Sequence, residues 1–173
     1  MSCIALHSTV QAIEWVNGLN GTFSSSIEET DNPDIIRRSF ETPHHKMTID
    51  LPGENAPLTF SNGHFYVRAD DPDTGAIILV NIFQAKNKLG YTEVRRLLVD
   101  TFGGVTEEHK GSNVNDTYFF AKEVDEYGNQ FHYKWFIAHN YLFSVVVAAV
   151  GPDYDAQISC WSNCLNSVVW KKS

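Results

Sequence analysis

Alternation of apolar and polar residues predicts strands over most of the chain after residue 45. Between Lys46 and Leu51, three apolar residues alternate with polar ones, and Pro52-Gly53 then ends the run. Runs of similar length follow, separated by turn residues such as Gly, Pro, Asn and Asp. The pattern predicts six strands, at 46–51, 64–69, 76–84, 118–125, 130–138 and 141–150.

Two of these runs, 76–84 and 141–150, are apolar on both faces. This pattern is typical of strands that are covered on both sides. The strands are joined mostly by short turns, including "DDPDTG" at 70–75 and His139-Asn140. Short turns join antiparallel neighbours, so the sheet is expected to be largely antiparallel.

Helical periodicity predicts three helices. The first starts at Ser8, where Ser8 and Gln11 form a capping box, and ends at Gly18 and Gly21. The second covers 91–102, and Gly103-Gly104 ends it. The third follows Gly151-Pro152-Asp153, with an apolar stripe along one side formed by Tyr154, Ile158, Trp161, Leu165 and Val168.

These elements predict one domain of the α+β class. We expect a mainly antiparallel six-stranded sheet with helices on both faces, because the doubly apolar strands need cover on each side. Residues 1–21 are interpreted as an N-terminal helix, 22–45 as a polar loop or linker with room for a strand near Arg37–Phe40, and 46–173 as the α+β domain.

Net charge limits the kinds of partner that the protein can bind, and cysteine content indicates the compartment in which it works. The net charge of −8 argues against nucleic acid, which requires clustered Lys and Arg, and against an anionic membrane surface. The first residues lack the pattern of a secretory signal, and no apolar run is long enough to span a bilayer. With three cysteines, an odd number, we expect a reduced, cytoplasmic protein.

The stretch "CWSNC" at 160–164 has three interpretations: a redox pair, part of a metal site, or a buried helix face. A redox motif places two residues between its cysteines, and a zinc site needs further ligands. Cys164 adjoins the apolar stripe of the last helix, next to Trp161. Core packing is therefore the favoured interpretation.

Other candidate chemistry is weaker. The adjacent histidines of "PHHK" (43–46) point to opposite sides of an extended chain, so they do not share a metal. "DDPDTG" lacks the distal Glu of a calcium loop and is expected to be a hairpin turn. The glycines after 91–102 follow a helix rather than a strand, so they do not form a phosphate loop. We predict no cofactor and no metal.

The segments "MTIDLPGE", "HFYVRADDPDTGAIILVNIFQ", "YTEVRRLLVDTF" and "YLFSVVVAAV", with the closing helix, resemble the Mog1/PsbP-like superfamily in their order. The resemblance covers about 46–170 and rests on patterns, not on signature residues. It implies an α/β/α sandwich. The superfamily includes a GTPase-binding nuclear import factor, photosystem extrinsic subunits and bacterial proteins, some of which are secretion-effector chaperones. Most members act by binding other proteins, so the resemblance implies a protein-binding role without transferable functional residues.

Two functions are therefore retained. The first is a non-enzymatic protein-binding module, such as a chaperone, adaptor or immunity-type protein, which binds another protein with a basic surface through an acidic or aromatic surface. The second is a small-molecule binder or enzyme with a pocket between sheet and helix. The candidate binding residues lie on one strand, with three on each of its faces: Phe131, His132, Tyr133, Lys134, Trp135 and Phe136.

Overall fold

Residues 12–17, 23–53, 57–111 and 117–172 are described by a computed structural model of the chain. Within 12–17 the backbone is not helical, and Trp15 instead forms an antiparallel bridge to Ala85. The first predicted helix is therefore wrong for 12–17, and the rest of it, at 1–11 and 18–21, lies outside the described residues.

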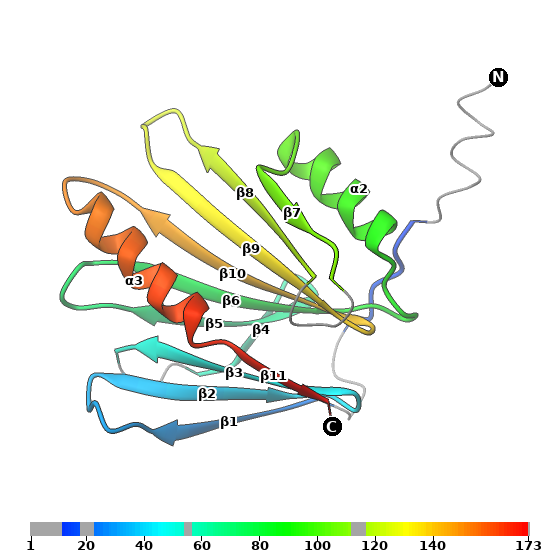
Figure 1. Cartoon of the computed structure of the whole chain (residues 1–173), viewed down its shortest axis with the longest axis horizontal. Coiled ribbons are helices and arrows are strands. Elements are labelled where there is room, and N and C mark those ends of the chain that lie inside the picture. The colour runs from blue at the N-terminus through cyan, green and yellow to red at the C-terminus, as the bar shows by residue number, and fades with distance from the viewer. Residues whose placement is uncertain (1–11, 18–22, 54–56, 112–116, 173) are drawn as a thin grey trace.

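The larger of two sheets has seven strands, and every neighbouring pair is antiparallel (Figure 1). All of the predicted strands except 46–51 belong to it. Its outer strands, β4 and β7, are short additions that the sequence did not predict. In spatial order the strands are β4 (Thr59–Ser61), β5 (His64–Asp70), β6 (Ile77–Gln84), β10 (Tyr141–Ala149), β9 (Gln130–Ala138), β8 (Tyr118–Val124) and β7 (Glu107–His109).

The smaller sheet has four antiparallel strands, formed by the first part of the described chain and by its last strand. Phe40 on β2 lies opposite Met47 on β3, which in turn lies opposite Trp170 on β11, so these three buried side chains share one face. In spatial order the strands are β1 (Ser24–Glu29), β2 (Ile35–Glu41), β3 (His45–Pro52) and β11 (Val169–Lys172).

The predicted six-stranded α/β/α sandwich is wrong, because the protein is a mainly-β sandwich of these two antiparallel sheets (Figure 1). Only two helices occur among the described residues, α2 (Tyr91–Phe102) and α3 (Tyr154–Asn166). The need to cover both faces of the central strands was inferred correctly. On one face, however, the cover is a second sheet with α3 beside it, where we expected helices alone.

The predicted loop or linker at 22–45 is also wrong, because β1, β2 and the start of β3 lie within it. Arg37–Phe40, where a strand was allowed, lies inside β2. The segment looks polar because "SSSIEE" belongs to an edge strand whose side chains are half-buried or exposed. An edge strand that covers a core needs few apolar residues, so its hydrophobic signal is weak.

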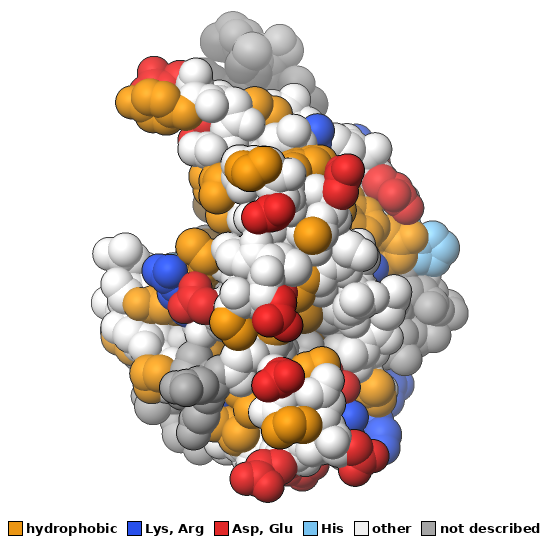
Figure 2. Space-filling model, turned by 90° about the vertical axis from the view of Figure 1, so that its left-hand side faces the viewer, with side chains coloured by type: hydrophobic (Ala, Val, Ile, Leu, Met, Phe, Trp, Pro, Cys, Tyr) orange, Lys and Arg blue, Asp and Glu red, His pale blue; other side chains and the backbone are white. Residues whose placement is uncertain are grey.

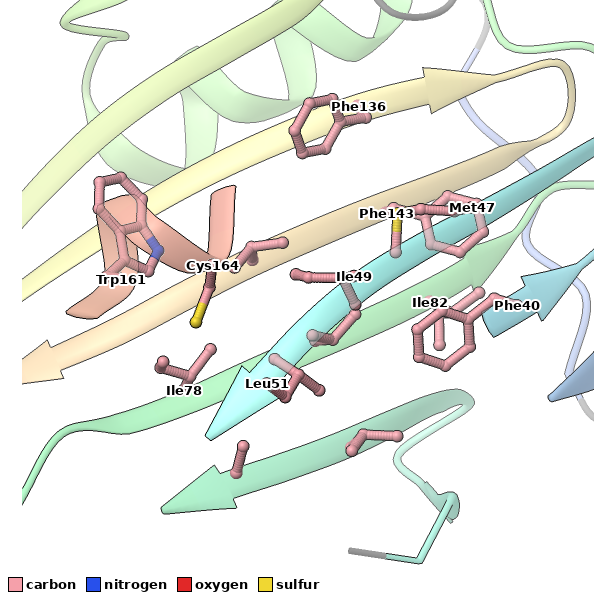
Figure 3. Packing of buried hydrophobic residues seen from close by; sticks show 14 of the residues in the cluster. Phe40, Met47, Ile49, Leu51, Ile78, Ile82, Phe136, Phe143, Trp161 and Cys164 are labelled. Atoms are coloured by element: carbon pink, nitrogen blue, oxygen red, sulfur yellow. The ribbon is translucent and has the colours of Figure 1, made fainter. Parts of the chain in front are cut away.

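The main core lies between the two sheets and extends under α3 (Figure 3). Ile49 and Leu51 of the small sheet face Ile78 of β6, and Phe143 of β10 packs at right angles to Trp170 of β11, with ring centroids 5.1 Å apart. Interdigitated apolar side chains from two inner faces are the usual core of a β-sandwich. This core holds the two sheets together.

A second core lies on the opposite face of the large sheet, beneath α2. Val94 and Leu98 of α2 are buried against Phe119, Trp135 and Leu142 of the sheet. The helix spans 91–102, as the sequence predicted, and Gly103 ends it in the left-handed conformation that favours glycine. The large sheet is therefore the middle layer of the molecule.

The "CWSNC" helix packs as predicted. Trp161 and Cys164 are buried in the main core, whereas Cys160 is half-buried. One polar residue shares the buried side, because Gln157 accepts a hydrogen bond from Val150 N–H (2.7 Å) and donates one to the Thr74 carbonyl (3.1 Å). Through Gln157, α3 is tied to the "DDPDTG" segment, which forms a turn as predicted.

The two sheets are in backbone contact where β3 ends, and this contact can be tested with a pair of glycines. Gly53 and Gly128 have nearly the same left-handed φ, of 85° and 83°. A methyl group at Gly53 would overlap the carbonyl oxygen of Asp70, at the end of β5, whereas one at Gly128 would meet nothing within 4 Å.

We expect Gly128→Ala to lower the free energy of unfolding by about 1–2 kcal/mol, the cost of the left-handed conformation. Gly53→Ala should cost about 1–3 kcal/mol more, because the backbones must separate. Urea denaturation of both variants measures the difference. Equal losses would show that the two sheets are not in close contact there.

Candidate functional site

A cleft of about 530 Å³ opens at the end of the molecule that carries the β1–β2 and β5–β6 turns. Its walls are the ends of β2 and β3, the β5–β6 turn and one side of α3. We call it the acidic cleft, because four aspartates line it and none of its described lining residues is Lys, Arg or His. The four are Asp34, Asp50, Asp71 and Asp73.

The surface around this end of the molecule is also acidic. Figure 2 looks onto it and shows Asp and Glu side chains distributed from top to bottom, whereas Lys and Arg lie mainly at the margins. Clustered negative charge raises the local concentration of cations and of cationic groups. The cleft is therefore suited to a positively charged ligand.

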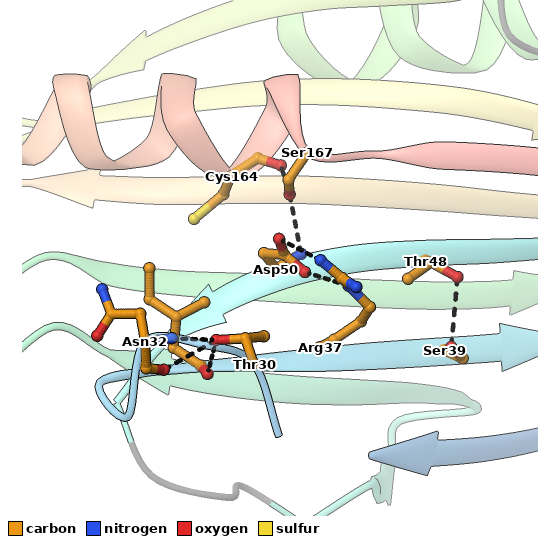
Figure 4. Close-up of polar contacts among 9 residues, drawn as sticks. Thr30, Asn32, Arg37, Ser39, Thr48, Asp50, Cys164 and Ser167 are labelled. Atoms are coloured by element: carbon orange, nitrogen blue, oxygen red, sulfur yellow. Dashed lines mark hydrogen bonds and ion pairs between the residues drawn. The ribbon is translucent and has the colours of Figure 1, made fainter. Parts of the chain in front are cut away.

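The four carboxylates are not equally available. Asp50 accepts two hydrogen bonds from Arg37, at 2.8 and 3.1 Å, so its charge is already balanced (Figure 4). Asp71 accepts one bond from the Thr74 hydroxyl and a longer one from the backbone N–H of Asp73. None of the ion pairs found among the described residues involves Asp34, Asp71 or Asp73. These three can accept further donors.

Hydrogen bonds fix the walls of the acidic cleft. Ser167, at the end of α3, donates to the carbonyl of Cys164 (2.6 Å) and accepts from the backbone N–H of Asp50 (2.8 Å), which links α3 to β3 (Figure 4). On the β1–β2 turn, Asp34 N–H donates to the side-chain oxygen of Asn32 (2.9 Å). The aspartates are thus held in place before any ligand binds.

Two thiols lie on the α3 side of the acidic cleft. The hydrogen bond that Cys164 donates to Cys160, together with burial, raises the pKa of the Cys164 thiol far above its usual range. The same hydrogen bond lowers the pKa of Cys160, against the opposing effects of burial and of nearby Asp71. Of these two thiols, Cys160 therefore has the greater nucleophilic character.

The six candidate residues on β9 do not form one site. Phe131, Tyr133 and Trp135 point to the α2 side of the large sheet, whereas His132, Lys134 and Phe136 point to the side covered by the small sheet and α3. Trp135 and Phe136 are each only 4% exposed, so both are core residues.

Each of the remaining polar candidates already interacts with a neighbouring side chain. Tyr133 donates to Glu123 (3.2 Å), and its burial raises the pKa of its hydroxyl to about 12. The Lys134 ammonium lies 4.3 Å from the ring centre of Tyr118, and burial lowers its pKa.

His132 Nε2 lies 3.1 Å from the Tyr154 hydroxyl, and this hydroxyl already donates to Gln130 (2.8 Å). The imidazole is therefore the donor, through Nε2–H. Burial, with a smaller effect of Lys122, lowers the pKa of His132. His132 thus serves to connect β9 with α3.

Sequence reasoning missed the acidic cleft, because its residues come from four separate segments. "DNPD", Asp50, "DDPDTG" and "CWSNC" were each visible as local features, and each was interpreted separately as a loop, strand, turn or helix. The pairing of β2 with β3, the contact of β3 with β5 and the packing of α3 on β3 bring these segments together. The net charge of −8 was the one property of the whole sequence that pointed to an acidic surface.

No family model, curated protein or solved structure matches this chain. The resemblance to the Mog1/PsbP-like superfamily therefore rests on the sequence patterns alone, and the β-sandwich differs from the architecture that it implies.

Within the described ranges, no three His, Cys, Asp or Glu side chains are grouped so as to hold a metal ion. Neither described helix has the length and apolar character needed to cross a membrane.

The two thiols provide a test of the geometry of the acidic cleft. We expect iodoacetamide to alkylate Cys160 at least about tenfold faster than Cys164 in the folded protein, because Cys164 is buried and firmly protonated. Peptide mass spectrometry after timed quenching gives both rates. The difference should disappear in denaturant, and in Cys160→Ser the Cys164 thiol should stay unlabelled until the protein unfolds. Equal rates in the folded state would contradict the described packing of α3.

Proposed function

We propose that this protein is a binding module that receives a basic segment of another protein in the acidic cleft. The observation that carries the proposal is the lining of the acidic cleft, which contains four aspartates and no basic residue among its described members. Of the two surfaces suggested by the sequence, acidic or aromatic, the acidic one is favoured, because Trp135 and Phe136 on the aromatic strand are buried.

The chemistry of the acidic cleft fits guanidinium and ammonium groups. Asp34, Asp71 and Asp73 offer carboxylate oxygens from two facing turns, and Asn32 and Asn163 add amide groups nearby. Carboxylates bind Arg through paired, charge-assisted hydrogen bonds, which are stronger than neutral ones. Asp50 cannot contribute in the same way, because Arg37 occupies both of its oxygens. We therefore assign recognition to the other three.

A volume of about 530 Å³ favours a side chain or a short segment over an extended surface. It falls within the range of pockets that enclose small ligands. A partner that inserts one or two Lys or Arg side chains would fill it, while the acidic surround in Figure 2 accelerates the encounter. Affinity should accordingly fall as ionic strength rises.

A labelled basic peptide tests this function directly. We expect fluorescein-labelled hexa-arginine to bind with 1:1 stoichiometry in a fluorescence anisotropy titration, and hexa-glutamate not to bind. The double variant Asp71→Asn/Asp73→Asn should bind about 2- to 30-fold more weakly, because it loses two charge pairs of about 0.2–1 kcal/mol each.

The matched control is Asp100→Asn/Glu41→Gln, which removes the same charge from exposed residues outside the acidic cleft. It should keep nearly the affinity of the unmodified protein. If both double variants weaken binding equally, the peptide responds to net charge alone and the acidic cleft is not the site. Absence of any saturable binding at low salt would likewise contradict the proposal.

A further inference from the structure

A second pocket, of about 410 Å³, lies on the opposite face of the large sheet from the small sheet and α3. We call it the α2 pocket. It is bounded by the C-terminal half of α2, by the segment 15–17, by the β4–β5 turn, and by side chains of β6, β9 and β10 that face α2. Neither pocket shares a lining residue with the other.

The walls of the α2 pocket are aromatic on two sides. Trp15 and Phe83 form one wall, with ring centroids 5.7 Å apart, and Phe102 with Trp135 forms the other, at 4.9 Å. Leucines of α2 and β10 add aliphatic surface to the lining. Aromatic rings in facing walls favour a flat ligand, because rings pack well face to face or edge to face.

No Asp, Glu, Lys, Arg or His occurs among the described residues that line the α2 pocket. A charged ligand would lose its hydration there without gaining a counter-ion, which is costly. The α2 pocket therefore selects uncharged molecules, in contrast to the acidic cleft on the other face.

The size and the fixed walls distinguish the α2 pocket from a packing defect. Voids in protein cores are rarely larger than a water molecule, whereas pockets for small molecules measure about 300–1,000 Å³. The Trp15 wall is held to the sheet by two backbone hydrogen bonds, from Val16 N–H to Gln84 (2.7 Å) and from Lys86 N–H to Glu14 (2.9 Å). These bonds fix the backbone of the wall beside the large sheet.

Two exposed amides border the α2 pocket. The side chains of Asn17 and Asn62 have no hydrogen bond to any residue of the described ranges. Asn62 is held in a left-handed conformation in the β4–β5 turn, with φ of 53°. By contrast, the hydroxyl of Thr101 already donates to the Leu97 carbonyl (2.7 Å). The two amides are the groups that can fix the polar end of a ligand.

We propose that the α2 pocket binds an uncharged, mainly apolar aromatic small molecule, with its ring between the two aromatic walls and a hydrogen-bonding group near Asn17 and Asn62. This site is independent of the proposed function, because it lies on the other face of the large sheet. It matches the general form of ligand pockets, in which apolar walls surround a few polar groups.

The neutral dye N-phenyl-1-naphthylamine tests the site, because its fluorescence rises in an apolar environment. We expect saturable 1:1 binding with a Kd in the micromolar range. Thr101→Trp, which places a large side chain on the lining, should weaken binding at least about tenfold. The control Thr92→Trp, at an exposed position of α2 outside the lining, should not change the Kd.

Circular dichroism of both variants shows whether each has folded, and Leu97→Phe provides a second, more conservative way to fill the α2 pocket. The anionic dye 1-anilinonaphthalene-8-sulfonate should bind more weakly than the neutral one. Absence of saturable binding, or binding unchanged in both folded pocket variants, would overturn the proposal, and tighter binding of the anionic dye would overturn the assignment to neutral ligands. Asp71→Asn/Asp73→Asn should leave dye binding unchanged, so that failure of one site is distinguishable from failure of the other.

Discussion

Burial of both faces of the β6–β10 pair is the constraint on which the rest of the structure depends. Val145 and Val147 of β10 point into the main core, whereas Leu142 and Val146 point to the other face, and all four are nearly inaccessible to water. A two-stranded unit with apolar side chains on both sides is unstable in water unless each side is covered. The cover of the first face, the small sheet with α3, comes from segments before β6 and after β10, whereas the cover of the second face, α2, lies between these two strands in the chain.

Different elements cover the two faces, and both pockets lie where a cover ends. On one face the small sheet and α3 meet beside the β5–β6 turn, and the acidic cleft opens at that junction. On the other face α2 covers β8, β9 and part of β10, and the α2 pocket lies between the helix and the segment around Trp15. A close-packed core leaves no room for ligands, so binding sites are expected at such junctions.

The two sites are chemically opposite, which gives the molecule two separate binding faces. Three of the four aspartates of the acidic cleft lie on turns, which are the segments that usually carry function on a β scaffold. The α2 pocket is lined by aromatic and aliphatic side chains of regular elements. The large sheet lies between them, and hydrogen bonds pair all seven of its strands into one layer.

Local periodicity predicted the strands and helices that have a strong apolar pattern. The doubly apolar runs became β6 and β10, and the stripe of 91–102 became α2. Periodicity could not reveal that β1 and β2 form a second sheet, since their outer side chains are polar, nor that a short last strand, β11, pairs with β3. That pairing joins residues more than a hundred positions apart, and no local pattern encodes it.

The same dependence on contacts between distant segments explains why the sequence did not predict the two sites. Asp71 and Cys160 were both noticed in the sequence, but their proximity depends on how α3 packs beside the small sheet. The β9 residues were selected because they alternate cleanly, and this alternation is itself the sign that each face is packed against a cover. A strand buried on both sides offers core residues rather than surface anchors.

Native-state hydrogen exchange tests most directly the claim that the small sheet is an integral cover of the large one. If the two sheets share one core, the central amides of β3 and β10, such as those of Ile49 and Val145, should exchange only through global unfolding, with the same opening free energy. If the opening free energy of the β3 amides were lower than that of the β10 amides by more than about 2 kcal/mol, the small sheet would open independently. That result would contradict a single core shared by the two sheets.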